Sequence, residues 1–188
     1  SNHLTRSLLH PFGEPTFARE FRNIQRYREL GIPALQAAFF AEQRLPGERR
    51  AILLTRALDG WQDLDQLLHG WQALGEAQRA AILRACGELA RCLHKAGQMH
   101  GCFYPKHIFL RATARGCEAR RIELEKTRPL LFGKRDRVKD LEPLLRRASV
   151  WSEAEIRLLL LSYLGNERDV DSWSLRLGAR RRHKEARR

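Results

Sequence analysis

A polar and aromatic segment in the middle of this 188-residue chain carries the side chains best suited to chemistry. It contains two imidazoles and a thiol, at His100, His107 and Cys102. Two carboxylates, Glu123 and Glu125, follow at alternate positions, and we expect them to share one face of a strand. Carboxylate oxygens are the ligands that hard cations prefer, so these two are the best local candidates for cation binding.

Apolar periodicity predicts the elements that must position this segment. Apolar residues at helical spacing directly precede this segment. In the rest of the chain, turn and capping residues mark where helices and strands begin and end. The expected order is a helix over 15–30, a hairpin of strands 34–40 and 51–55, a short helix from Asp63, a long helix over 76–96, strands 108–110 and 122–124, a helix opened by Asp140, and a helix over 152–164.

Composition limits the class of protein. Apolar residues make up 43% of the chain, which is enough for a buried core and rules out wholesale disorder. We expect no membrane-spanning helix and no secretory leader, and the four cysteines lack the CxxC spacing of a zinc ribbon. Because the chain opens with Ser1 rather than Met, we expect further residues upstream in the parent protein.

The charge is strongly positive, with a formal net value of +13. Residues 180–188 hold six basic groups and one acidic group, so we expect residues 179–188 to form a disordered basic tail drawn to polyanions. A nucleic acid is the least favoured partner, because the other basic residues are dispersed and no nucleic-acid motif is present.

The central segment follows the catalytic-loop pattern of protein kinases, H-R-D-L-x-P-x-N-I-L. His100, Pro105 and Ile108 fall in register with that pattern without a gap. Together with "PFGEPTFAREFRNI", "LLTRALDGW", "HGCFYPKHIFL" and "LEKTR", this makes roughly residues 3–165 resemble the lipopolysaccharide kinase family. The resemblance is to the Kdo- and heptose-core kinases, and within them to the InaA branch.

The resemblance implies an α+β, protein-kinase-like fold with a mainly helical C-lobe. It places a partial N-lobe at 1–55, a hinge at 56–62, and the C-lobe at 63–178. We expect the glycine-rich loop and the lysine strand to be missing, because too few residues precede the helix that starts near Pro15. On this expectation the chain by itself cannot close a normal nucleotide pocket and is inactive.

The resemblance also implies roles on the nucleotide side of the cleft. Glu20 would be the helix glutamate that pairs with the nucleotide-positioning lysine, and Thr55 and Ala57 would belong to the hinge against which adenine stacks. ATP with Mg²⁺ would be the cofactor.

On the acceptor side, Cys102 occupies the catalytic Asp position and His107 the metal-binding Asn position. Glu123 occupies the position of the D-F-G aspartate, and Asp140 that of the aspartate that braces the catalytic loop. His100 corresponds to a histidine that is usually structural in kinases. A thiol is a poorer proton acceptor than a carboxylate, and imidazole is a soft ligand for Mg²⁺.

Two functions remain open at this point. One is a kinase that transfers phosphoryl from ATP to a sugar hydroxyl of lipopolysaccharide, in the cytoplasm or peripherally at the inner membrane. The alternative is a pseudokinase-like module that binds a protein partner, lipopolysaccharide core or another anionic glycolipid, with contact to a membrane surface.

Overall fold

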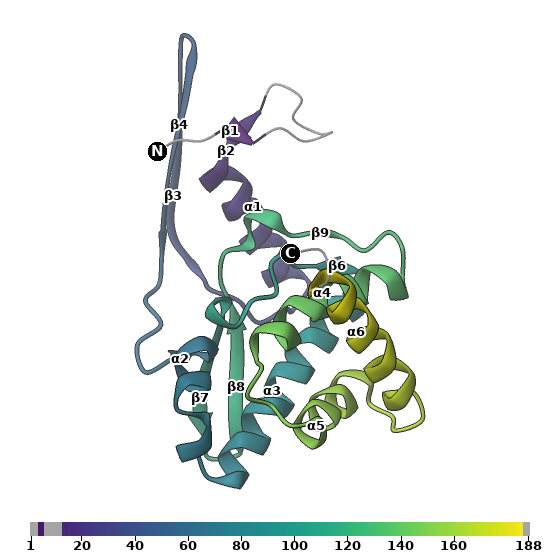
Figure 1. The fold of residues 1–188 in the computed structure, drawn as a ribbon. Coiled ribbons are helices and arrows are strands. Elements are labelled where there is room, and N and C mark those ends of the chain that lie inside the picture. The colour runs from purple at the N-terminus through teal and green to yellow at the C-terminus, as the bar shows by residue number, and fades with distance from the viewer. Residues whose placement is uncertain (1–3, 6–12, 186–188) are drawn as a thin grey trace.

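The computed structural model describes residues 4–5 and 13–185, which form an N-terminal part of strands around one helix and a larger, mainly helical C-terminal part (Figure 1). The helices are α1 (Thr16–Glu29), α2 (Leu64–His69), α3 (Glu76–Lys95), α4 (Lys134–Arg147), α5 (Glu153–Leu164) and α6 (Val170–Glu185). The strands are β1 (Leu4–Thr5), β2 (Glu14–Pro15), β3 (Ala37–Leu45), β4 (Glu48–Thr55), β5 (Gln62–Asp63), β6 (Gln98–Met99), β7 (Ile108–Thr113), β8 (Gly116–Arg121) and β9 (Arg128–Pro129).

The predicted N-terminal hairpin is confirmed as the antiparallel pair β3 and β4, which turns at Gly47. In Figure 1 it projects beyond the rest of the molecule, with α1 beside its base. Phe21 of α1 stacks on Phe40 of β3 with ring centroids 4.2 Å apart. The apolar stripe of α1 therefore attaches the hairpin to the body of the protein, and buried Ile24 and Tyr27 continue that stripe into the core.

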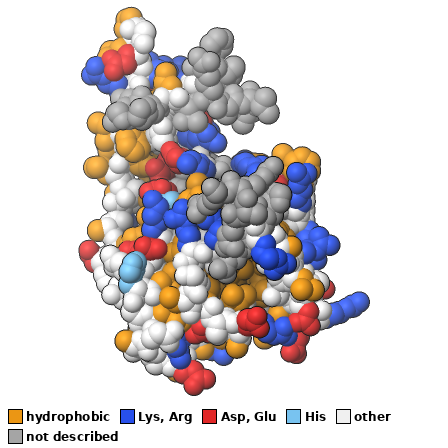
Figure 2. All heavy atoms as spheres, viewed as in Figure 1, with side chains coloured by type: hydrophobic (Ala, Val, Ile, Leu, Met, Phe, Trp, Pro, Cys, Tyr) orange, Lys and Arg blue, Asp and Glu red, His pale blue; other side chains and the backbone are white. Residues whose placement is uncertain are grey.

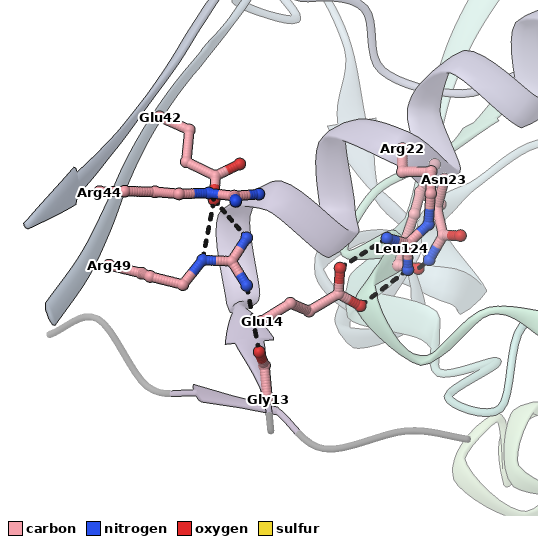
Figure 3. Close-up of polar contacts among 8 residues, drawn as sticks. All are labelled: Gly13, Glu14, Arg22, Asn23, Glu42, Arg44, Arg49 and Leu124. Carbon is pink, nitrogen blue, oxygen red and sulfur yellow. Dashed lines mark hydrogen bonds and ion pairs between the residues drawn. The ribbon is translucent and has the colours of Figure 1, made fainter. Parts of the chain in front are cut away.

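An ion pair fixes the start of α1 (Figure 3). The carboxylate of Glu14, which is buried, accepts two hydrogen bonds from the guanidinium of Arg22, at 2.5 and 2.7 Å. Arg49 of β4 donates to the carbonyl of Gly13 and to the carboxylate of Glu42. The residues just before α1 are thus held by both the helix and the hairpin.

The core of the C-terminal part is formed by helices α3, α4 and α5 together with one small sheet. The sheet has the antiparallel order β5-β7-β8 and packs on α3. On its other side α3 packs against α5, and the two helices approach very closely at Gly87, where an added Cβ would lie 2.5 Å from the carbonyl oxygen of Leu159. Leucines of α3, α4 and α5 fill the core between these elements. Among the described residues, no helix is both long enough and apolar enough to cross a membrane.

Two predicted boundaries and one predicted face are wrong. The helix expected to open at Asp140 begins at Lys134, because the carboxylate of Asp136 accepts hydrogen bonds from the backbone N–H groups of Leu131 and Phe132 and so fixes the first turn. The second strand after the central segment is β8, which ends at Arg121. Glu123 and Glu125 consequently do not share a strand face: Glu123 has a positive φ of 55°, and Glu125 lies in the 3₁₀ turn Leu124–Lys126.

The predicted disordered tail is also corrected. Residues 179–185 continue α6, a helix that was not expected, and residues 186–188 lie outside the described residues. Val170, Trp173 and Leu177 recur at helical spacing and are buried. Their stripe packs α6 on α4 and α5, which is why the helix forms despite its arginines.

Candidate functional site

A buried carboxylate organises the central segment. Asp140 lies in the middle of α4, and its side chain is fully enclosed. Its two oxygens accept hydrogen bonds from the backbone N–H groups of His100 and Gly101, each at 2.8 Å. Hydrogen bonds to an ionised acceptor are about twice as strong as neutral ones, so this carboxylate fixes the backbone where it turns out of β6.

His94 extends this arrangement into the helices. One of its ring nitrogens, Nε2, lies 3.0 Å from the carboxylate of Asp140, and the other, Nδ1, lies 2.8 Å from the hydroxyl of Tyr163 on α5. Sequence analysis missed His94 as a site residue. The available signal was a polar side chain directly after Leu93, on the buried face of the long helix.

A buried guanidinium holds the same segment from the other side. Arg121, the last residue of β8, donates from Nη2 to the carbonyl of Cys102 at 3.0 Å and lies over the ring of Phe103 at 4.3 Å. Its Nε and Nη1 have no hydrogen-bond partner among the residues that the structure describes. Burial lowers the pKa of Arg121 to about 10, so the side chain remains charged at neutral pH. Sequence analysis missed this residue too, although Arg121 occupies an inward-facing position of β8, like the buried Ala119.

His100 is enclosed and neutral. Its Nε2 donates to the carbonyl of Ile122 at 3.1 Å, and its Nδ1 accepts from the backbone N–H of Cys102 at 3.3 Å. Burial is the largest cause that holds the pKa of His100 well below its usual value, and the charge of Arg121 adds to it. The contacts of His100 are those of a residue that shapes the backbone rather than one that moves a proton.

His107 and Glu123 face each other. The Nδ1 of His107 donates to the carbonyl of Cys102 at 3.1 Å, and its Nε2 lies 3.0 Å from a carboxylate oxygen of Glu123. Burial lowers the pKa of His107, while the carbonyl of Cys102 and the carboxylate of Glu123 oppose that change. A neutral imidazole that donates from Nδ1 has no proton on Nε2, so no hydrogen bond joins it to Glu123, whose side chain is 59% exposed.

Helix α1 reaches the same region through two side chains. Asn23 donates to the carbonyl of Leu124 at 2.6 Å (Figure 3), and the carboxylate of Glu20 accepts from the backbone N–H of Leu124. Burial raises the pKa of Glu20, and the nearby charges of Glu125 and Glu123 raise it further. Glu20 is therefore bound to the segment that carries Glu123, and its predicted pairing with a lysine stays a prediction.

The donor set does not fit Mg²⁺. Across the described part of the chain, no three or more His, Cys, Asp or Glu side chains are placed to hold one metal ion. The two predicted metal residues, His107 and Glu123, contact each other instead. Mg²⁺ requires near-octahedral coordination by oxygen, and these residues offer one carboxylate and one imidazole.

The two predicted hinge residues lie apart from these contacts in the chain. Thr55 ends β4, Ala57 follows it, and both are exposed. Their predicted role in stacking against adenine stays a prediction.

Comparisons with known proteins agree with this arrangement. A family model described as "Lipopolysaccharide kinase (Kdo/WaaP) family" matches residues 1–163. The chain belongs to this family. It is 30% identical over 130 residues to Protein InaA of Escherichia coli (strain K12), covering 68% of this chain and 60% of that protein. This member of the family thus spans less than two thirds of its curated relative.

The fold is shared with a solved family structure. The chain resembles WaaP in complex with acyl carrier protein, with a TM-score of 0.76 and 22% identity, over 95% of this chain and 77% of that one. The predicted kinase-like architecture of mixed helix and strand is confirmed at this level. That the N-lobe lacks the glycine-rich loop and the lysine strand stays a prediction.

Replacing the Asp140 carboxylate tests its role in holding the central segment. Asp140→Asn keeps the shape but removes the charge and one acceptor, so the buried N–H of His100 and the part-buried N–H of Gly101 lose charge-assisted partners. We expect the free energy of unfolding to fall by about 3 kcal/mol in urea denaturation. Asp59→Asn, an exposed change between β4 and β5, should alter it by less than about 0.5 kcal/mol. Equal effects from the two variants would contradict the assignment.

The buried His100 makes stability depend on pH. Because its folded pKa is lowered, its contribution is fully present above about pH 6.5 and is lost as the pH falls below that value. His100→Gln should flatten the fall in unfolding free energy between neutral and mildly acidic pH, whatever it does to stability at neutral pH. His69→Gln, on the exposed end of α2, should leave the slope unchanged. An identical slope in His100→Gln and the parent chain would refute this account.

Proposed function

We propose that this chain is a kinase-fold module that recognises lipopolysaccharide core or a related anionic glycolipid without transferring phosphoryl itself. The residue types at the proposed metal and acceptor positions carry the proposal. Glu123 is the one carboxylate that the family register offers for a metal, its neighbour His107 offers a nitrogen where that register has an oxygen ligand, and Cys102 supplies no carboxylate on the acceptor side. Because phosphoryl transfer depends on neutralising charge around the phosphates, a site without these groups retains binding rather than chemistry.

The family suggests ATP as a cofactor. The described residues support nucleotide binding, but only without a bound metal ion. Since the donor set at His107 and Glu123 does not fit Mg²⁺, no catalytic step is assigned to it. Thr55, Ala57 and Glu20 remain the proposed nucleotide-side residues.

The loop between β9 and α4 is suited to a lipid surface. Leu131 and Phe132 are 69% and 62% exposed. The buried carboxylate of Asp136 accepts hydrogen bonds from the backbone N–H groups of both residues. These bonds fix the backbone of the loop, and the two side chains therefore remain exposed to solvent. Figure 2 shows hydrophobic side chains beside basic ones at the edge of the molecule where this loop lies.

The charge around the loop matches an anionic membrane. Residues 126–139 contain six Lys and Arg residues and one acidic residue, the buried Asp136. Leu130 donates to the carbonyl of Gly97, and β9 pairs with β6, which leads into the central segment. We therefore propose that the chain binds peripherally at the cytoplasmic face of the inner membrane, with this loop inserted and the central segment close to the lipid headgroups.

Phosphoryl transfer to a sugar hydroxyl is the second candidate. Membership of a kinase family favours it, as does the carboxylate that Glu123 retains at the proposed metal position.

A protein partner is a further candidate. The WaaP structure was a complex with acyl carrier protein. On this chain, one face of the β3–β4 hairpin exposes Phe39, Ile52 and Leu54, which offers a partner protein an apolar surface.

The response to nucleotide tests the metal site. We expect the melting temperature to show no Mg²⁺-dependent increase with ATP, compared with ATP plus EDTA, because His107 and Glu123 offer Mg²⁺ only one carboxylate. Thermal-shift titration of this chain and of Glu123→Gln measures the difference. An increase that requires Mg²⁺ and disappears in Glu123→Gln would contradict the proposal by establishing metal-dependent nucleotide binding at Glu123, the step that phosphoryl transfer requires.

Removing the exposed apolar pair of the loop tests the membrane assignment. Leu131→Ser with Phe132→Ser should weaken binding to phosphatidylcholine vesicles containing phosphatidylglycerol by about tenfold or more, because each inserted CH₂ contributes roughly 0.8 kcal/mol. Co-sedimentation measures the change. Ile52→Ser with Leu54→Ser, which removes similarly exposed side chains from the hairpin, is the matched control. Equal loss in both double variants, or no vesicle binding by the parent chain, would refute the assignment.

A further inference from the structure

A second concave site lies away from the central segment. It is a pocket of about 450 Å³ where the second half of α1, the segment 32–37, the residue after β4 and the end of β8 meet. This volume is within the range of small-molecule sites. Neither Cys102, His107 nor Glu123 lines it, so it is separate from the site described above.

The pocket is cationic and contains no acid. Arg28, Arg56 and Arg120 line it together with the amides of Gln25 and Gln36. None of the three arginines forms an ion pair with a described residue, whereas Arg22, Arg111 and Arg146 do. No Asp or Glu is among the lining residues. Three positive side chains without a counter-charge make the pocket attractive to an anion that carries more than one negative charge.

The walls are held by the backbone rather than by mobile side chains. Leu35 donates to the carbonyl of Arg121 at 2.9 Å, and Arg121 donates back to the carbonyl of Pro33 at 3.1 Å. Arg56 donates from its backbone to the carbonyl of Gln36 at 2.8 Å. The pocket therefore exists before a ligand arrives, which reduces the entropy lost on binding.

The lining also has an apolar side. Ile24, Ile32 and Leu35 are buried and contribute to it. The guanidinium of Arg120 lies 4.8 Å from the ring centroid of Trp61, which lines the neighbouring pocket rather than this one. Inorganic phosphate alone would leave most of this space and its apolar wall unused.

We propose that this pocket binds a phosphate monoester carried on an organic body. Guanidinium groups match phosphate oxygens with paired hydrogen bonds, and a dianionic phosphate balances most of the charge of three arginines. The phosphate can belong to a free sugar phosphate or to the headgroup of a lipid, because both present the same dianion.

The pocket lies between elements that are distant in sequence. Arg28 belongs to α1, Arg56 follows β4, and Arg120 belongs to β8. A phosphate that contacts all three would join the helix that carries Glu20 to the strand that leads to Glu123.

Isothermal titration calorimetry with glucose 6-phosphate, and separately vesicle binding with phosphatidic acid, tests the proposal on the full chain. The pocket variant is Arg28→Gln with Arg56→Gln and Arg120→Gln. The matched control is Arg84→Gln with Arg115→Gln and Arg176→Gln, which removes the same charge from exposed positions elsewhere. Thermal denaturation establishes that both variants fold.

We expect at least one of the two probes to bind, with the dissociation constant weakened about tenfold or more in the pocket variant and less than about twofold in the control. Binding of glucose 6-phosphate supports a free metabolite, and binding of phosphatidic acid alone supports a lipid headgroup. Equal weakening in both variants, or no binding of either probe, overturns the proposal. The calorimetry does not depend on the Mg²⁺ response or on Leu131 and Phe132. In the vesicle measurement that loop contributes equally to the pocket variant and to the control, so only a difference between these two variants reports on the pocket.

Discussion

One buried carboxylate, that of Asp140, makes the backbone turn at His100 and Gly101 possible inside the protein. A buried N–H without an acceptor costs about 1–3 kcal/mol, and this turn places the buried N–H of His100 beside the part-buried N–H of Gly101. Asp140 accepts from both and also contacts His94, which lies against Tyr163. A single side chain on α4 thereby joins α3, α5 and the central segment.

The contacts that shape the central segment are independent of the side chain at position 102. Arg121 and His107 both bind the carbonyl of Cys102, and Asp140 binds the backbone before it. Since only main-chain atoms of residues 100–102 take part in these contacts, apart from the ring of His100, the fold sets no demand for a carboxylate at Cys102. This explains how a kinase-like architecture can persist where the family's acceptor-side chemistry does not.

Elements with a strong local signal could be predicted from the sequence. The helix α1, the hairpin of β3 and β4, the long helix α3 and the helix α5 all formed as expected. The register of the central segment with the kinase pattern also predicted one common site for four residues. In the structure Asp140 contacts the backbone of His100, and His107 contacts Glu123. Local periodicity and a gap-free motif were sufficient for these features.

The features that were missed depend on partners distant in sequence or on a single unusual dihedral angle. His94 and Arg121 look like ordinary polar residues until α4 and the segment around Cys102 supply their partners. The positive φ of Glu123 interrupts a stretch whose residue types favour a strand, and no neighbouring residue signals that break. The start of α4 depended on the bonds of Asp136 to Leu131 and Phe132 rather than on apolar spacing.

The close approach of α3 and α5 at Gly87 determines how a displacement of one helix affects the other. Layers of side chains between helices can absorb small displacements by changing rotamer, but a contact between main-chain atoms has no such compliance. With Gly87 against the carbonyl of Leu159, the two helices form a rigid pair that carries the small sheet on α3 and helix α6 on α5. A displacement of α3 is therefore passed to α5 without being absorbed by side chains between them.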